Sequence, residues 1–313
     1  MTITQLQYAL ALAEHRNFTL AAEKCSITQP TLSMQIQKLE EELDTLIFDR
    51  TKKPIQLTEV GVKIIEQAKR IVNESERIHD IIDIQKGFIG GDFKIGIIPT
   101  IMPTLLPMFL NTFIKKYPKV NLIIEERTTA DIIQKLKNGH LDAGILATPL
   151  EDPEIIEKVL YYEPFVGYIP RNNKLYALDK ITPNDIDINE LLLLQDGHCF
   201  SEGVLNFCKN KSLHANTHFQ LQSGSFETLV QLANEGLGIT FLPYLHTLNI
   251  SEKDKSKLKH FEKPEPSREV SLVHTKDELK SQITNALYSL ISGVIRGAIT
   301  FQDVKIISPL HKK

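Results

Sequence analysis

The chain has 313 residues, of which 42% are apolar and 24% are charged, a composition typical of globular proteins and unlike that of disordered or collagen-like chains. At roughly 100 to 200 residues per domain, this length predicts two or three domains. The net charge of −3 gives no overall sign of nucleic-acid binding, so a DNA-binding role must rest on where the charges lie. The three cysteines are too few for a disulfide scaffold and wrongly spaced for a zinc site, and we expect no metal and no cofactor.

The N-terminal sequence lacks the basic segment and apolar core of a secretory signal, so we expect a cytoplasmic protein. One stretch, Ile95 to Ile114, runs for twenty residues without a charge, which is long enough to span a bilayer. Pro99, Pro103 and Pro107 interrupt it. Their spacing favours a strand, a turn and a helix start in a folded domain over insertion into a membrane.

The first 58 residues predict three helices followed by a hairpin. Apolar residues at helical spacing indicate helices over 4–15 and 18–25. A third helix begins after Thr28, a good N-cap, with Pro30 in its first turn and an apolar stripe on one face. Its other face carries small hydroxyl and amide side chains, which reach base edges and phosphates without filling the major groove. An ordinary polar helix face is the alternative interpretation.

The segment from Phe48 to Thr58 predicts an extended hairpin with three cations near its tip, Arg50, Lys52 and Lys53. Such a hairpin suits a wing that contacts the phosphate backbone. The acidic run Glu40 to Glu42 lies beyond the reading part of the third helix. We expect it to face away from DNA, because carboxylates repel phosphate.

Four stretches at fixed spacing carry a family resemblance: Phe18-Thr-x-Ala21-Ala22-Glu23, Thr28-Gln29-Pro30-Thr31-Leu32-Ser33-x-Gln35-Ile36-x-x-Leu39-Glu40, Phe48-x-Arg50 and Leu57-Thr58-x-x-Gly61. The pattern resembles the winged helix-turn-helix of LysR-type transcriptional regulators. The resemblance implies a two-domain regulator that binds double-stranded DNA, with RNA polymerase as a further partner. The expected DNA-binding residues are Thr28, Gln29, Pro30, Thr31, Ser33, Gln35, Lys38, Arg50, Lys52 and Lys53.

A long helix is predicted from Thr58 to Lys86, and the glycines within 87–91 then end it and form a hinge. Its apolar positions alternate at steps of four and three, a heptad seam that a lone helix cannot bury. Dimerisation through this helix is the economical interpretation, and packing onto the chain's own sensor domain is the alternative. The family resemblance favours the dimer and implies a tetramer. The seam residues are Ile64, Ala68, Ile71, Ser75, Ile78 and Ile82.

Beyond the hinge, strand and helix patterns alternate, which predicts a mainly parallel α/β sheet in two lobes. The arrangement resembles the periplasmic-binding-protein-like sensor of the same family. We therefore expect a winged helix-turn-helix domain over 1–58, a linker helix and hinge over 59–91 and a two-lobed redox-sensing regulatory domain over 92–313. The segment 298–313 has no assigned role. The expected strands are 93–98, 122–126, 142–147, 165–169, 191–194, 218–222, 239–242 and 268–274, and the expected helices begin near 103, 129, 225 and 277.

Two cysteines lie nine residues apart, Cys199 just beyond an apolar run and Cys208 within the following segment. A protonated His198 and the N–H groups of a helix starting near Phe200 would favour the Cys199 thiolate, which makes this sulfur the candidate nucleophile towards peroxide. Nine residues of helix separate the Cα atoms by about 13 Å, whereas a disulfide tolerates about 7 Å, so linking the two sulfurs requires the segment to unravel. Inert, packed cysteines are the alternative.

The sequence Asp196-Gly197-His198-Cys199, with Cys208 nine residues later, resembles the redox segment of OxyR-type hydrogen-peroxide sensors within the LysR-type family. The resemblance implies that Cys199 is the peroxidatic cysteine, that Cys208 resolves its sulfenic acid into a disulfide, and that hydrogen peroxide is the signal. The peroxide-binding residues that it implies are Thr100, Thr129, His198 and Arg268.

One departure is Ser201, which stands where well-known members of the group carry an arginine. Arg268 either supplies the missing cation or forms a surface salt bridge. The expected function is peroxide-responsive regulation of transcription, not enzymatic catalysis, because a thiol peroxidase gains nothing from a winged helix. A LysR-type regulator that responds to a small metabolite between the lobes is the alternative.

Overall fold

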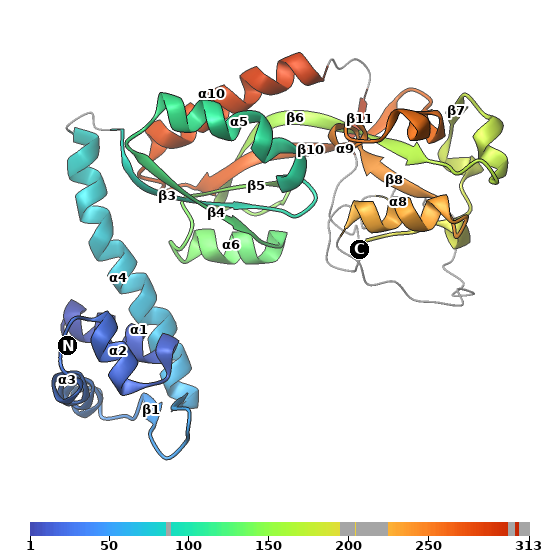
Figure 1. The fold of residues 1–313 in the computed structure, drawn as a ribbon. Coiled ribbons are helices and arrows are strands. Elements are labelled where there is room, and N and C mark those ends of the chain that lie inside the picture. The colour runs from blue at the N-terminus through green and yellow to red at the C-terminus, as the bar shows by residue number, and fades with distance from the viewer. Residues whose placement is uncertain (86–88, 195–203, 205–224, 300–303, 307–313) are drawn as a thin grey trace. The chain divides into compact units, whose positions relative to one another are not determined.

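The computed structural model describes residues 1–85, 89–194, 204, 225–299 and 304–306. They form two compact units, Met1–Phe88 with Asn138–His140, and Ile89–Lys137 with Leu141–Lys313 (Figure 1). None of the helices in these ranges combines the length and apolar content that crossing a bilayer requires. The strand expected over 218–222 lies outside the described residues.

The first three helices of the N-terminal unit each begin where the sequence provides a side chain to cap the helix. The hydroxyls of Thr2 and Thr28 and the amide oxygen of Asn17 accept hydrogen bonds from the first-turn N–H groups. Leu32, Ile36 and Leu39, on the stripe predicted for the third helix, are fully buried. The helices are α1 (Ile3–His15), α2 (Phe18–Lys24) and α3 (Gln29–Glu42).

The predicted wing forms. Strands β1 (Phe48–Asp49) and β2 (Gln56–Leu57) pair antiparallel, with Phe48 opposite Leu57. Glu40 anchors the wing to α3, because its Oε1 accepts hydrogen bonds from the N–H groups of Ile47 at 2.8 Å and Phe48 at 3.0 Å. Glu40 is only 5% exposed, so it is an internal anchor and not part of a solvated acidic face.

The linker helix α4 extends over Glu59–Gln85, close to its predicted range. Its first half packs into the same core as α1 and α3, so part of its apolar surface is buried within its own unit. Ile64 and Ile71 of the predicted seam lie half-buried against this core, whereas Ile78 is 59% exposed. Among the helix residues whose burial is described, the buried apolar side chains are Ile65, Ala68 and Val72.

The second unit is built on one sheet with the strand order β4-β3-β5-β10-β6-β9-β7. Outside this order, β8 pairs with β6 and β11 pairs with β10. The predicted parallel pairing is present in β3, β4 and β5, but the sheet as a whole is mixed, because β10 runs antiparallel to both β5 and β6, and β6 runs antiparallel to β8 and β9. The strands are β3 (Gly91–Ile97), β4 (Val120–Glu126), β5 (Ala143–Thr148), β6 (Ile155–Tyr168), β7 (Lys180–Ile181), β8 (Thr240–Pro243), β9 (Leu258–Phe261), β10 (Glu265–Thr275) and β11 (Val304–Ile306).

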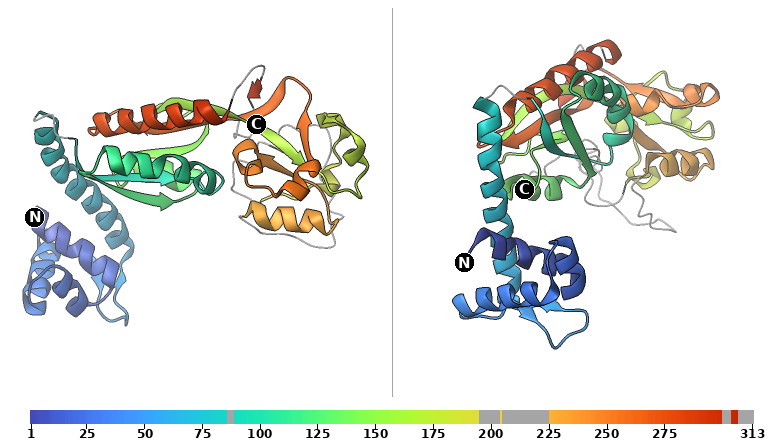
Figure 2. Two further views of the ribbon diagram at one scale, coloured as in Figure 1. Left: turned by 45° about the horizontal axis from the view of Figure 1, so that its top comes forward. Right: turned by 60° about the vertical axis from the view of Figure 1, so that its left-hand side comes forward.

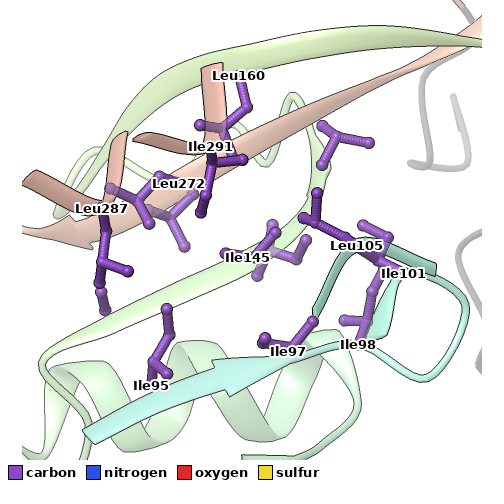
Figure 3. Packing of buried hydrophobic residues seen from close by; sticks show 14 of the residues in the cluster. Ile95, Ile97, Ile98, Ile101, Leu105, Ile145, Leu160, Leu272, Leu287 and Ile291 are labelled. Carbon is purple, nitrogen blue, oxygen red and sulfur yellow. The ribbon is translucent and has the colours of Figure 1, made fainter. Parts of the chain in front are cut away.

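Three helices enclose the first lobe: α5 (Met102–Lys116), α6 (Thr129–Lys137) and α10 (Ser281–Ala298). Helices α5 and α10 lie together over one face of the sheet and α6 covers the other (Figures 1 and 2). Isoleucine and leucine side chains from β3, β5, β10, α5 and α10 interlock in the core between them (Figure 3). Gly144 lets α6 approach, since a Cβ there would lie 2.5 Å from Cγ2 of Ile132.

The second lobe has its own core around β6, β8, β9 and α8 (Phe226–Asn234). The strand expected over 191–194 forms only an isolated bridge between Leu191 and Ile239, so this prediction is wrong. Part of the C-terminal segment without an assigned role forms β11, which pairs parallel with β10 at Glu265–Ser267.

Candidate functional site

A buried ionic network lies where the two long strands of the second unit run side by side. Arg268 of β10 is directly opposite Glu163 of β6, and the side chains are 3% and 0% exposed. The Nε and Nη2 atoms of Arg268 donate to Oε2 of Glu163 at 2.9 and 2.7 Å. The antiparallel register therefore brings together two charges that lie 105 residues apart in the chain.

The same guanidinium reaches Thr100, which follows β3 and is 6% exposed. Nη1 of Arg268 donates to the Thr100 hydroxyl at 2.9 Å, and Nη2 donates to the Thr100 carbonyl at 3.0 Å. Because the Thr100 oxygen accepts a hydrogen bond from Arg268, its own proton points elsewhere and can be donated to a ligand.

Glu163 has a second role at the start of a short helix, α9 (Tyr244–Thr247). Its other oxygen, Oε1, accepts a hydrogen bond from the Leu245 N–H at 2.9 Å. The N-cap residue Pro243 makes no side-chain cap, so the carboxylate from β6 satisfies this first-turn donor. The network thus links the end of β3, the strands β6 and β10 and the helix α9.

Two further titratable groups surround the network. The Tyr161 hydroxyl is buried without a hydrogen-bond partner among the described residues. Burial raises the pKa of this hydroxyl most, and the negative charge of Glu163 raises it further. His246 packs against Phe226, with ring centroids 5.0 Å apart, and burial lowers its pKa. Both groups are therefore neutral at pH 7.

The structure brings Thr100 and Arg268 together, as expected for parts of one site. It excludes the surface salt bridge for Arg268, which forms a buried ion pair instead. Thr129 is the first residue of α6 and is half-buried. The other predicted site residues, His198, Cys199 and Cys208, lie outside the described residues, as does Ser201.

Sequence reasoning missed Glu163, Tyr161 and His246. The sequence does contain a signal for the first of these, because Glu163 is the only charged residue in the apolar and aromatic stretch 160–169. A lone carboxylate in such a strand must find a partner when it is buried.

The predicted DNA-reading residues lie at the start of α3. Thr28, Gln29 and Pro30 are exposed, and the hydroxyls of Thr28 and Thr31 share a hydrogen bond of 2.8 Å. Further along the helix, Ser33 is half-buried and Lys38 is exposed. Gln35 is half-buried and accepts a hydrogen bond from the Gln5 amide at 3.3 Å, so it has a packing role as well.

The wing carries the remaining predicted DNA contacts. Lys52 and Lys53 are exposed at its tip. Arg50 is different, because its Nη2 donates to Oε2 of Glu40 at 2.6 Å and its guanidinium lies 5.5 Å from the ring centre of Phe18. Arg50 therefore also holds the base of the wing, and Arg50, Lys52 and Lys53 remain its candidate phosphate contacts.

Two protein-family models match the chain: the bacterial regulatory helix-turn-helix protein of the lysR family over residues 3–62, and the LysR substrate binding domain over residues 86–295. The hydrogen peroxide-inducible genes activator of Pectobacterium carotovorum subsp. carotovorum is 35% identical over 274 residues, which cover 88% of this chain and 90% of that protein.

Two solved structures extend the similarity to the fold. A full-length OxyR variant from Pseudomonas aeruginosa is 32% identical with a TM-score of 0.74, covering 93% of this chain and 98% of that one. An OxyR mutant of Corynebacterium glutamicum with hydrogen peroxide bound is 25% identical with a TM-score of 0.63, covering 95% and 93%. The chain therefore belongs to the LysR family of transcriptional regulators and, within it, to the OxyR group.

Proposed function

We propose that this protein regulates transcription in response to hydrogen peroxide, which it binds with Thr100, Thr129, His198 and Arg268. The observation that carries the proposal is the buried hydrogen bond from Nη1 of Arg268 to the Thr100 hydroxyl, 2.9 Å long. It fixes the orientation of a hydroxyl that can donate to a small polar ligand. The names of the relatives, and the peroxide-bound structure among them, agree with this chemistry.

The signal is converted into a covalent bond in two steps. The Cys199 thiolate attacks one oxygen of hydrogen peroxide, so that an S–O bond forms, the O–O bond breaks and hydroxide leaves; the sulfur is oxidised by two electrons and peroxide is reduced. The Cys208 thiolate then attacks the sulfenic sulfur, and the oxygen leaves as hydroxide, which becomes water on protonation. The product is a Cys199–Cys208 disulfide. Closing this disulfide across nine residues rebuilds the segment between them.

The winged helix-turn-helix over 1–58 reports this change to double-stranded DNA. Residues 59–91 connect it to the regulatory domain over 92–313. The protein acts as a homodimer joined through α4 and assembles into a tetramer in the cytoplasm, where RNA polymerase is a further partner. The heptad spacing of the apolar residues on α4 supports an interhelical contact, and Ile78, one of them, is 59% exposed. In this function the cysteines undergo a stoichiometric switch and are not a catalytic centre.

Cysteine variants test the proposal. We expect Cys199→Ser to abolish both the oxidation and the peroxide-dependent change in the promoter footprint, and Cys208→Ser to trap a sulfenic acid on Cys199 without a disulfide. Cys25→Ser is the matched control, because Cys25 belongs to the DNA-binding unit, and this variant should respond as wild type does. A peroxide response in Cys199→Ser equal to that of wild type would exclude Cys199 as the sensor, and a wild-type footprint that peroxide leaves unaltered would favour regulation by a metabolite.

A further inference from the structure

Glu163 is the one charged group of the buried network that the proposed function leaves without a task. Its side chain is fully buried, and both oxygens are used: Oε2 accepts two hydrogen bonds from Arg268, and Oε1 accepts one from the Leu245 N–H. Its position is therefore fixed from two sides, by β10 and by the start of α9.

This arrangement fixes the guanidinium in turn. Arg268 uses Nε and Nη2 for Glu163, and the planar fork then directs Nη1 towards Thr100. A guanidinium keeps its positive charge in proteins, so the carboxylate opposite it balances the charge of the site. Burial has the largest effect on the pKa of the two neighbours, raising that of Tyr161 and lowering that of His246; on each of them Glu163 acts to raise the pKa and Arg268 acts to lower it.

We propose that Glu163 is a positioning residue that also determines specificity: it holds Arg268 against Thr100 and cancels the charge of the guanidinium, so that the site admits a neutral peroxide and disfavours anions. The inference rests on the proposed function, since it assumes that peroxide reacts beside Thr100 and Arg268. It goes further by assigning a residue that sets which oxidants can react.

The chemical argument concerns the charge of the ligand. Hydrogen peroxide is neutral at pH 7 and needs only hydrogen-bond donors and acceptors. Carboxylates, sulfate and anionic peroxides bind tightly where an arginine offers a free two-pronged contact, and here Glu163 occupies that contact. Removing the carboxylate charge would therefore leave a buried cation that attracts anions.

The test compares two oxidants of different charge on Cys199. Hydrogen peroxide gives a sulfenic acid and hydroxide. Peroxymonosulfate, an anion, gives the same sulfenic acid and sulfate, because the thiolate attacks its terminal peroxide oxygen and the O–O bond breaks. We expect Glu163→Gln to raise the ratio of the peroxymonosulfate rate constant to the hydrogen peroxide rate constant by at least about tenfold, which corresponds to about 1.4 kcal/mol. An unchanged ratio would overturn the proposal, because a general structural defect alters both rates alike.

Three further variants sharpen the result. Glu157→Gln is the matched control. Glu157 lies on the same strand and accepts a hydrogen bond from the Leu150 N–H at 3.0 Å, but it is paired with Val273 instead of Arg268. The ratio of the two rate constants in Glu157→Gln should therefore equal that of wild type. Arg268→Gln should lower the ratio, and this variant carries the test if Glu163→Gln does not fold. The double variant Glu163→Gln/Arg268→Gln should return the ratio towards wild type, and a failure to return would contradict charge cancellation.

A measurement without oxidation separates this inference from the proposed function. Sulfate should raise the unfolding temperature of Glu163→Gln more than that of wild type at equal ionic strength, because it binds the folded protein in which the Glu163 carboxylate no longer balances the charge of the guanidinium. If wild-type Cys199 resists hydrogen peroxide while this sulfate effect is present, the proposed function fails and the charge role of Glu163 stands. If Cys199 reacts with peroxide but sulfate acts equally on both proteins, the inference fails alone.

Discussion

Replacing Glu40 by alanine should destabilise the DNA-binding unit far more than its place in an acidic run suggests. The substitution leaves the N–H groups of Ile47 and Phe48 without their acceptor, and these two residues are 0% and 2% exposed. Each buried donor left unsatisfied costs about 1–3 kcal/mol, so we expect a loss of about 3–4 kcal/mol. The ion pair with Arg50 adds at most about 1 kcal/mol, because the Arg50 side chain is 37% exposed.

Hydrogen exchange of the full-length protein measures this effect at the wing. We expect the protection of the Ile47 and Phe48 amides to fall by a few hundredfold in Glu40→Ala, as about 3–4 kcal/mol at about 1.4 kcal/mol per factor of ten implies, and DNA affinity to fall with it because the wing loses its anchor. Glu41→Ala is the matched control: Glu41 is exposed, and among the described residues it accepts a hydrogen bond from the Gln37 amide. Equal protection in the two variants would refute the assignment of Glu40 as an anchor.

Lys53→Ala should weaken binding to every DNA sequence and reduce the slope of log K against log salt by about 0.9, whereas Gln29→Ala should relax sequence preference with the slope unchanged; titrations at several salt concentrations measure both. Ile78→Asp should shift sedimentation towards the monomer, because it places a charge on an exposed apolar position of α4. Burial raises the pKa of Glu278 from 4.5 to about 7, so the folded state retains a proton that the unfolded state releases. The free energy of unfolding of the wild type should therefore fall as pH rises through this interval. Urea unfolding at several pH values should show that Glu278→Gln loses this component of the pH dependence.

Each of these predictions has an outcome that would contradict it. A Lys53→Ala effect confined to one operator, or a Gln29→Ala effect equal on all sequences, would mean that the wing and the reading helix are wrongly assigned. An unchanged sedimentation coefficient for Ile78→Asp would remove this residue from the dimer contact. A wild-type and a Glu278→Gln protein with parallel stability curves between pH 4.5 and 7 would show that the buried carboxyl is not the titrating group.

Local signals in the sequence predicted the elements well where one short segment decides the structure. Thr28 and Pro30 define the start of α3, and the strand and helix patterns of the first lobe lie within a few residues of their observed positions. The direction of strand pairing is different, because it depends on chain segments far apart. Nothing within β10 shows that it runs antiparallel to β5 and β6.

The candidate site shows the same difference between features that local sequence predicts and features that depend on distant chain segments. The family resemblance predicts Thr100 and Arg268, but it does not show that the same guanidinium also contacts Glu163, which lies on another strand far away in the sequence. Glu40 shows the same limit on a smaller scale. In the sequence it stands in a run of acids, although on a helix it lies one turn after the buried Ile36 and shares its face.

The most direct test of the account maps the thiols of the reduced, full-length protein before and after hydrogen peroxide and follows the promoter footprint in the same samples. We expect peptides joined by a Cys199–Cys208 disulfide, a changed footprint and a free thiol on Cys25, since burial raises the pKa of that thiol and lowers its thiolate fraction. Three free thiols after treatment, or a complete disulfide with an unaltered footprint, would contradict it.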